Sequence, residues 1–266
     1  MPEGHTIRHL ATAHSYGFVG TTVRASSPQG RFAEGAHLID GRQMTDVTAH
    51  GKHLFMHFDD DIVHIHLGLY GWFTLRKNKS IEPKDSVRLR IANDEYMSDL
   101  SGPTACEIFT LEQMHNKLDK LGPDPIKEDA DWKYVWESIH KSNRPIGALL
   151  MDQSVVAGIG NVYRAELLFL AGVDPFMPGK SLETTEFEVI WNDAVRLLRL
   201  GAVDGHIRTV AKEHLEDDEL VLMLHGKGQN GYVYKRTGQA CRLCRRPIMS
   251  DDLAGRTVYW CQKCQK

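Results

Sequence analysis

Four cysteines near the end of the chain constrain its fold more than any other feature. They form two pairs, Cys241-x2-Cys244 and Cys261-x2-Cys264, with sixteen residues between the pairs. Each pair can turn two sulfurs towards one ion, and two such pairs close a tetrahedron that leaves no open coordination position. The spacing therefore predicts a structural site for one Zn2+ per chain, with a redox-active or disulfide pair as the alternative.

The residues around these cysteines predict a basic hairpin. Residues 257–260 and those near Pro247 alternate as paired strands do, which would leave Gly255-Arg256 at the tip. Residues 235–266 contain eight basic and two acidic side chains, a net charge of +6, whereas the whole chain carries −3. An arginine on a rigid tip in a basic module is suited to binding phosphate, although such a cluster can also be a solvated surface.

The first residues, Pro2-Glu3, have the chemistry of a covalent catalyst. If Met1 is removed, as a small second residue permits, Pro2 becomes a free secondary amine. An α-amino group has a pKa of about 8, against about 10.4 for lysine, so its nucleophilic form is far more abundant near neutral pH. A secondary amine that attacks a sugar C1′ gives an iminium, and Glu3 beside it can act as general acid or base. The alternative is that many chains begin Met-Pro without catalytic consequence.

Length and composition place the chain among ordinary globular proteins. Its 266 residues suit one large domain or two smaller ones, and 42% of them are hydrophobic. No uninterrupted apolar run approaches the roughly 20 residues that cross a bilayer, and the N-terminus lacks the pattern of a signal peptide. We therefore expect a cytoplasmic protein without a membrane partner.

The residue pattern changes twice along the chain, which predicts an α+β protein. Apolar positions at helical spacing predict a helix over residues 4–16. Short β-branched and aromatic runs then predict an all-β region over 19–109, with strands at 53–58, 62–67, 72–76 and 87–92. After residue 110 the pattern is helical, with segments at 111–121, 132–141, 145–152, 162–171 and 183–200. A Gly-Pro linker places a domain boundary near 125–130.

One further segment, residues 149–166, has features of a phosphate-binding site. Gly158 and Gly160 permit a tight backbone, and a helix is predicted to start near Asn161. The backbone amides and the dipole at a helix start favour an anion. The simpler alternative is an ordinary helix cap.

Together these motifs resemble the formamidopyrimidine-DNA glycosylase and endonuclease VIII family of DNA repair enzymes, over nearly the whole chain. The resemblance is carried by Pro2-Glu3-Gly4, the turn Gly51-Lys52-His53-Leu54, the stretch from Asp152-Gln153 to Gly158-Ile159-Gly160-Asn161, and the cysteine module with Gly255-Arg256. The opening PEG and the turn Leu69-Tyr70-Gly71 are similar to the endonuclease VIII branch in its actinobacterial form. The other branch typically begins PELPE.

The resemblance implies a role for each matching residue. Pro2 would be the nucleophile and Glu3 the general acid, with Lys52 at the sugar-phosphate. Asn161 would bind backbone phosphate, and Arg256 would hold the phosphates that flank the lesion. Leu69 and Tyr70 would fill the gap left by a flipped-out nucleotide. The four cysteines would hold zinc.

The resemblance also implies a fold, an activity and a partner. The expected parts are an N-terminal β-sandwich domain with flanking helices (1–125), a helix-two-turns-helix domain (130–230) and a four-cysteine zinc finger (235–266). The expected activity is a bifunctional DNA glycosylase and AP lyase of base excision repair, acting on oxidised bases, pyrimidines first, in damaged double-stranded DNA. We expect a monomer associated with the nucleoid, with structural zinc and no catalytic cofactor.

Several points stay open at this stage. Thr6 stands where the formamidopyrimidine branch has an acidic residue, and Gly68 where endonuclease VIII usually has glutamine, so the base preference is undecided, as is duplex against single-stranded or bubble DNA. The segment 205–231 is either a lid over the flipped base or disordered, and Cys106 has no assigned role.

Two other functions compete with repair catalysis. One is a non-catalytic zinc-finger DNA-binding paralogue, which the presence of Pro2, Glu3 and Lys52 disfavours. The other is a metal-dependent hydrolase, for which a group of histidines would supply the ligands: His50, His53, His57, His64 and His66. Histidines on a strand more often form hydrogen bonds within a sheet.

Overall fold

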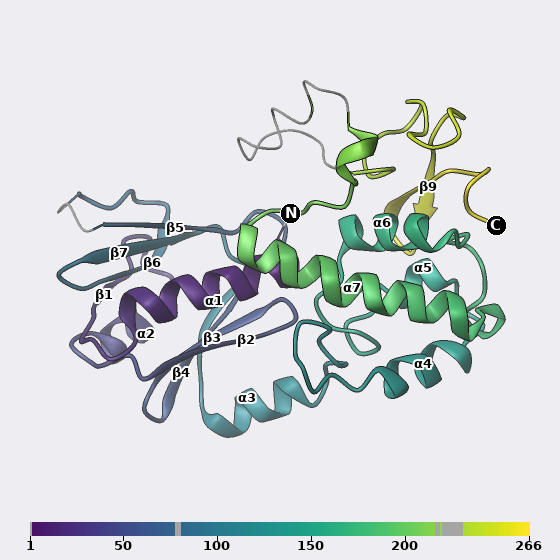
Figure 1. Cartoon of the computed structure of the whole chain (residues 1–266). Helices are drawn as coiled ribbons and strands as arrows, with labels where there is room; N and C mark the ends of the chain where they lie inside the picture. Colours follow the sequence, from purple (N-terminus) through teal and green to yellow (C-terminus); the bar gives the residue numbers. More distant parts are fainter. Residues whose placement is uncertain (1, 78–80, 216–218, 220–230) are drawn as a thin grey trace. The chain divides into compact units, whose positions relative to one another are not determined.

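The computed structural model describes residues 2–77, 81–215, 219 and 231–266, and it divides into two compact units, Met1–Lys120 and Leu121–Lys266 (Figure 1). Residues 216–218 and 220–230 of segment 205–231, for which a lid or disorder was expected, lie outside the described residues. The α+β class is confirmed. The finer division into 1–125, 130–230 and 235–266 stays a prediction, since the contacts separate only two units.

The N-terminal unit is a sandwich of two four-stranded antiparallel sheets. One sheet has the order β1-β6-β7-β5 and the other β2-β3-β4-β8. The strands are β1 (Arg24–Ser26), β2 (Asp46–His50), β3 (His53–Phe58), β4 (Asp61–His66), β5 (Trp72–Lys77), β6 (Val87–Ala92), β7 (Tyr96–Ser101) and β8 (Ala105–Phe109). Three helices flank them: α1 (Gly4–Phe18), α2 (Ala33–Ile39) and α3 (Leu111–Leu118).

The core of this unit follows from alternation along the strands. On β4, Val63 and Ile65 point into the main core cluster, where α1 adds Ile7, Ala11 and Phe18. The other face of β4 carries Ile62, which packs in a second cluster with Met114 of α3. Because successive side chains of a strand point to opposite faces, one run of apolar residues contributes to both clusters. The first residues of the chain are thereby fixed to the sandwich through α1.

The prediction that residues 19–109 are all β is wrong at one place. Residues 33–39 form the short helix α2, whose Ala36 and Ile39 are buried in the main core. Seven residues with Gly35 inside them give little helical periodicity, and the helix is held by packing rather than by propensity. A Cβ at Gly35 would overlap the ring of Phe32, so this glycine is needed for the ring to cover the helix.

The C-terminal unit is helical with a terminal hairpin. Its elements are α4 (Trp132–His140), α5 (Ile146–Leu149), α6 (Asn161–Ala171), α7 (Thr184–Asp204), the 3-10 turns η1 (Gly179–Ser181) and η2 (Lys212–His214), and strands β9 (Met249–Leu253) and β10 (Arg256–Trp260). Helices α6 and α7 pack together, and the buried Tyr163 hydroxyl donates to the Leu197 carbonyl over 3.2 Å. Helix α5 is much shorter than the predicted 145–152, because the chain turns from Leu150 onwards. None of the helices described, in either unit, is both long and apolar enough to cross a membrane.

A buried carboxylate ties the terminal module to helix α6. Glu166 accepts hydrogen bonds from the backbone amides of Tyr232, Val233 and Tyr234, at 2.7 to 2.9 Å, and from the Thr209 hydroxyl at 2.5 Å. Hydrogen bonds to an ionised acceptor are about twice as strong as neutral ones. This carboxylate therefore fixes where the chain enters the cysteine module.

Candidate active site

Pro2 and Glu3 lie at the start of α1. Glu3 is fully buried, and its extended backbone (φ −127°, ψ −176°) precedes the first helical residue. Its carbonyl accepts from the amides of Thr6 at 2.9 Å and Ile7 at 3.3 Å, while its side chain does not cap the helix. The carboxylate therefore does not cap the helix. It belongs to the residue at the positive end of the helix dipole, next to the half-buried Pro2.

Lys52 occupies the two-residue turn between β2 and β3. His50 pairs with His53 across the strands, and Gly51 adopts φ +55°, which the turn requires and glycine tolerates. Lys52 is half-buried. Burial is the main cause that lowers the pKa of His66, followed by the neighbouring His64 and then by the positive charge of Lys52. The side chain thus lies at the end of the sheet near β4.

The turn after β4 displays apolar side chains to solvent. Leu69 is 42% exposed and Tyr70 is 80% exposed, so both side chains are accessible from solvent. The preceding Gly68 has φ +66°, and a Cβ there would overlap the Thr104 hydroxyl. A side chain at this position, such as the glutamine usual in endonuclease VIII, would therefore be strained by the positive φ and would displace the Thr104 side chain. Trp72, two residues further, is 54% exposed and was not singled out from the sequence.

The histidines of β3 and β4 form a hydrogen-bonded chain. His64 Nδ1 lies 3.0 Å from the Glu107 carboxylate, and His64 Nε2 lies 2.8 Å from His53 Nδ1. A carboxylate only accepts, so neutral His64 donates through Nδ1 and accepts at Nε2 from His53. Burial is the main cause that lowers the pKa of His53, to about 2, and it also lowers the pKa of His64, so both imidazoles are neutral at pH 7.

This arrangement does not form a metal site. Among the residues that the structure describes, only the four cysteines form a group of three or more ligand side chains that could share an ion. His53 and His64 instead bond to each other, and their rings stack with centroids 5.1 Å apart. The hydrogen-bonding alternative for these histidines is the one the geometry supports.

Asn161 begins α6, as the sequence predicts. The loop before it is held by Gln153, whose amide donates to the carbonyls of Met151 and Ile159 and accepts from the Gly158 amide at 3.1 Å. Gly158 has φ +91°, which this tight loop requires. The Asn161 side chain is 8% exposed, and its nitrogen donates to the Thr257 carbonyl at 3.0 Å. The amide therefore faces the hairpin β9–β10.

Arg256 lies at the tip of that hairpin. It pairs with Leu253 across a turn of Ala254 and Gly255, both with positive φ, and the Gly255 amide donates to the Asp252 carboxylate at 3.1 Å. The Arg256 side chain is exposed. The predicted tip is thus present, and a rigid turn presents the guanidinium.

The four cysteines meet in one cluster. All their sulfurs lie within 4.8 Å of one another, with Cys241 to Cys264 at 3.9 Å and Cys244 to Cys261 at 3.3 Å. A tetrahedral ion with bonds of about 2.3 Å places its sulfurs about 3.8 Å apart. The residues present therefore fit a metal site with four cysteine ligands.

The predicted residues fall into two groups, one in each unit. Pro2, Glu3, Lys52, Leu69 and Tyr70 belong to the N-terminal unit, and Asn161, Arg256 and the cysteines to the C-terminal unit. In the second group Asn161 reaches the hairpin of Arg256 directly. Arg164 was not predicted; its only signal was an arginine one turn after Asn161, on a helix whose other charged residue is Glu166.

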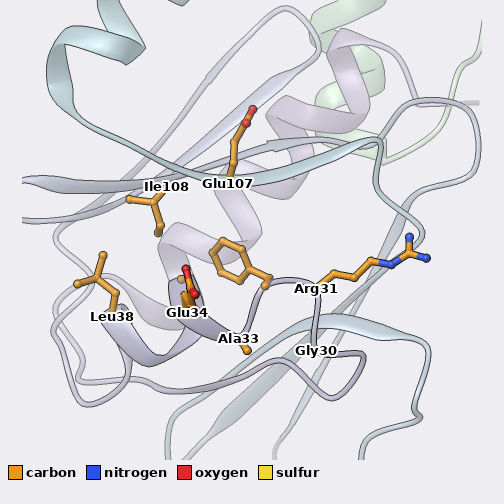
Figure 2. Close-up of a pocket in the computed structure, with 9 residues that line it drawn as sticks. Gly30, Arg31, Ala33, Glu34, Leu38, Glu107 and Ile108 are labelled. Atoms are coloured by element: carbon orange, nitrogen blue, oxygen red, sulfur yellow. The ribbon is translucent and has the colours of Figure 1, made fainter.

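A separate hollow in the N-terminal unit contains none of these residues. It measures about 780 Å³ and is lined by residues 30–35 with Leu38, Glu107 and Ile108. Figure 2 shows Arg31 pointing away from the apolar side chains of Leu38 and Ile108. The hollow therefore does not coincide with the predicted catalytic and DNA-binding residues.

Comparison with known families matches both units. The formamidopyrimidine-DNA glycosylase N-terminal domain matches residues 1–100, and the formamidopyrimidine-DNA glycosylase H2TH domain matches residues 121–212. Endonuclease 8 1 of Mycobacterium tuberculosis is 46% identical over 270 residues, covering 100% of both chains. Formamidopyrimidine-DNA glycosylase of Methylococcus capsulatus is 30% identical and covers 100% of this chain and 99% of its own.

Solved structures show the same fold. Lactococcus lactis Fpg in complex with DNA containing an abasic site superposes with a TM-score of 0.81 at 22% identity, covering 99% of each chain. A complex of the same protein with DNA containing N7-benzyl-Fapy-dG gives 0.80 at 23% identity over 100% of each chain.

Proposed function

This chain belongs to the formamidopyrimidine-DNA glycosylase and endonuclease VIII family of DNA glycosylases and AP lyases. We propose that it removes oxidised bases, with a preference for pyrimidines, from damaged double-stranded DNA. It then cuts the strand at the resulting abasic site. The observation that carries this proposal is Pro2-Glu3 at the start of α1, with the Glu3 carboxylate fully buried. We further propose that it acts as a monomer at the nucleoid.

The chemistry begins on the amine of Pro2 once Met1 is removed. Its nitrogen lone pair forms a bond to C1′, the bond from C1′ to the base breaks, and the base leaves with the bonding electrons. The N–H proton of the attacking amine is then lost and a proton is taken up by the departing base, so the nitrogen regains a lone pair that can expel O4′. Opening of the sugar ring, with a proton delivered to O4′ by Glu3, leaves an iminium between Pro2 and C1′. The iminium is an electron sink for the next step.

Strand cleavage follows by elimination. Loss of a proton from C2′ sends its electron pair towards the iminium, and the 3′ phosphate leaves with the electrons of the C3′–O bond. A second elimination can expel the 5′ phosphate and leave a one-nucleotide gap. Hydrolysis of the remaining imine frees Pro2, so the amine is regenerated and no cofactor is consumed.

The other predicted residues bind the DNA around this step. Lys52 approaches the sugar-phosphate from its turn, and Arg256 holds flanking phosphates from the hairpin tip. Leu69 and Tyr70, exposed on one turn, fill the space of the flipped nucleotide. The Asn161 side-chain amide already donates to the Thr257 carbonyl. We therefore assign phosphate binding to the first turn of α6, which Asn161 begins, because the helix dipole favours an anion there.

The metal of the cysteine cluster is proposed to be Zn2+. Four thiolates with no open position give a structural ion, which contributes folding energy to the module that holds Arg256. Pro2 and Glu3 act on the reacting sugar, with Lys52 at the sugar-phosphate.

Borohydride trapping tests the function against its alternatives. The enzyme should become covalently attached to DNA carrying an abasic site, whereas a non-catalytic DNA-binding paralogue would bind without attachment. Glu3→Gln should lose base excision yet retain some cutting of preformed abasic sites, because part of those sugars is already in the ring-opened aldehyde form, which needs no proton at O4′. A panel of duplexes and single strands with one oxidised pyrimidine, ring-opened purine or 8-oxoguanine each decides the base preference; excision of purines alone would overturn the pyrimidine proposal.

A further inference from the structure

Arg164 is a fully buried arginine in the first turns of α6. Its relative exposure is 0%, and it heads the largest fully buried side chains of the protein. Burying a guanidinium is costly unless its donors are matched by acceptors. What surrounds Arg164 therefore indicates why the charge is kept.

Arg164 bonds to the side chain that starts its own helix and to the hairpin. Its Nη2 donates to Asn161 Oδ1, in a short hydrogen bond, and to the Thr257 carbonyl at 3.1 Å. A guanidinium only donates and a carbonyl only accepts, so the Asn161 amide has one orientation, with its nitrogen on Thr257 at 3.0 Å. The Thr257 carbonyl thus receives two donors from α6.

The same guanidinium reaches the second strand of the hairpin. Nη1 lies 3.5 Å from the Leu253 carbonyl on β9 and 3.4 Å from the Gly147 carbonyl on α5. A Cβ at Gly147 would lie 2.8 Å from the Leu253 side chain, so the hairpin sits tightly on α5. Leu253 is the cross-strand partner of Arg256, and Thr257 follows it. Arg164 therefore holds both strands at the base of the turn that carries Arg256.

We propose that Arg164 is a positioning residue: it locks the hairpin β9–β10 to the start of α6, so that Arg256 and the first turn of α6 present one rigid phosphate-binding edge. The inference rests on the proposed DNA-binding function of Arg256. Without Arg164 the hairpin keeps its cysteines but loses its fixed direction, and Arg256 must be ordered again each time DNA binds.

A double-mutant cycle tests this coupling. Arg164→Met, Arg256→Ala and the double variant are compared with the wild type for binding to a duplex with a tetrahydrofuran abasic analogue at several salt concentrations. We expect each single variant to weaken binding roughly 10-fold or more and to reduce the salt slope by about 1, the value of one phosphate contact. The double variant should bind no more weakly than Arg256→Ala, because Arg164 acts through Arg256.

Matched variants separate positioning from charge and folding. Arg196→Met on the exposed face of α7 removes one positive charge far from the hairpin in sequence and should change binding far less. Arg164→Lys keeps the charge but cannot hold both strands, so it should show a partial loss and serves if Arg164→Met fails to fold. Zinc content and the melting temperature report on folding, and a rise in KM with little change in kcat is expected.

Two results would overturn the inference. Additive losses in the double variant, or an unchanged salt slope in both Arg164 variants, would leave Arg164 with a structural role only. A wild-type salt slope in Arg256→Ala would instead contradict the proposed role of Arg256 itself, whatever the Arg164 variants do.

Discussion

His14 makes the N-terminal unit sensitive to acid. His14 is a residue of α1, and its ring is fully buried: Nε2 lies 2.8 Å from the Ser98 hydroxyl and Nδ1 lies 2.7 Å from the Leu10 carbonyl. Burial lowers the pKa of His14 to about 4 from its ordinary value of 6.5. The helix that it supports carries Pro2 and Glu3 at its start, so its loosening would reach the reactive end of the chain.

The size of the effect follows from the pKa difference. Between pH 6.5 and 4 the unfolded chain takes up a proton on His14 that the folded chain does not, so stability falls as the pH falls. Above pH 6.5 His14 is neutral in both the folded and the unfolded chain, so no stability is lost there. At about 1.36 kcal/mol per pKa unit, the difference of about 2.5 units corresponds to roughly 3 kcal/mol lost by pH 4.

The perturbation is His14→Phe combined with Ser98→Ala, which leaves no orphaned hydroxyl. Urea unfolding is followed by fluorine NMR of 5-fluorotryptophan protein, because Trp72 is the one tryptophan in the sequence of the N-terminal unit. The wild type should lose roughly 3 kcal/mol more than the variant between pH 6.5 and pH 4. The other histidines are common to both proteins and cancel in this comparison. Equal losses in the two proteins would refute the reasoning.

The remaining predictions concern the thiols and the DNA-binding tip. Burial raises the pKa of Cys106 to about 12, so in the folded protein at pH 8 this thiol should resist iodoacetamide and should react only in urea. Fast alkylation of Cys106 in the native protein would contradict this. Cys261→Ala should lose zinc and DNA binding while the Trp72 resonance stays native, and retained affinity without zinc would count against it. Arg256→Ala should weaken binding to damaged and undamaged DNA alike and lower the salt slope by about 1, whereas a loss of lesion discrimination alone would point to another role.

Local patterns predicted the regular elements well where the chemistry is local. Strands β3 and β6 have the predicted bounds, 53–58 and 87–92, because β-branched and aromatic runs end there at turn residues. Helix α6 begins at Asn161 as predicted, since Gly160 precedes a segment with apolar side chains at helical spacing. The short helix α2 was missed because seven residues give too little periodicity to distinguish a helix from a loop.

The site was predictable as a set of residue types but not as a set of contacts. Cysteine spacing is enough to predict a metal cluster, because four ligands are identical and paired. Arg164 could not be found this way: its partner Thr257 lies 93 residues away, and its acceptor is a carbonyl that any residue would supply. The Asn161 amide was expected to face phosphate and instead bonds to the same carbonyl.

The central claim is that the amine of Pro2 attacks the sugar. Two preparations of the same chain, one with Met1 removed and one with Met1 retained, both verified by mass spectrometry, are trapped with borohydride on a duplex containing an abasic site. An internal proline nitrogen is a tertiary amide without a basic lone pair, so only the protein that begins at Pro2 should be cross-linked, and the adduct should map to its N-terminal peptide. Trapping of the protein that retains Met1, or an adduct that maps to Lys52, would contradict the claim.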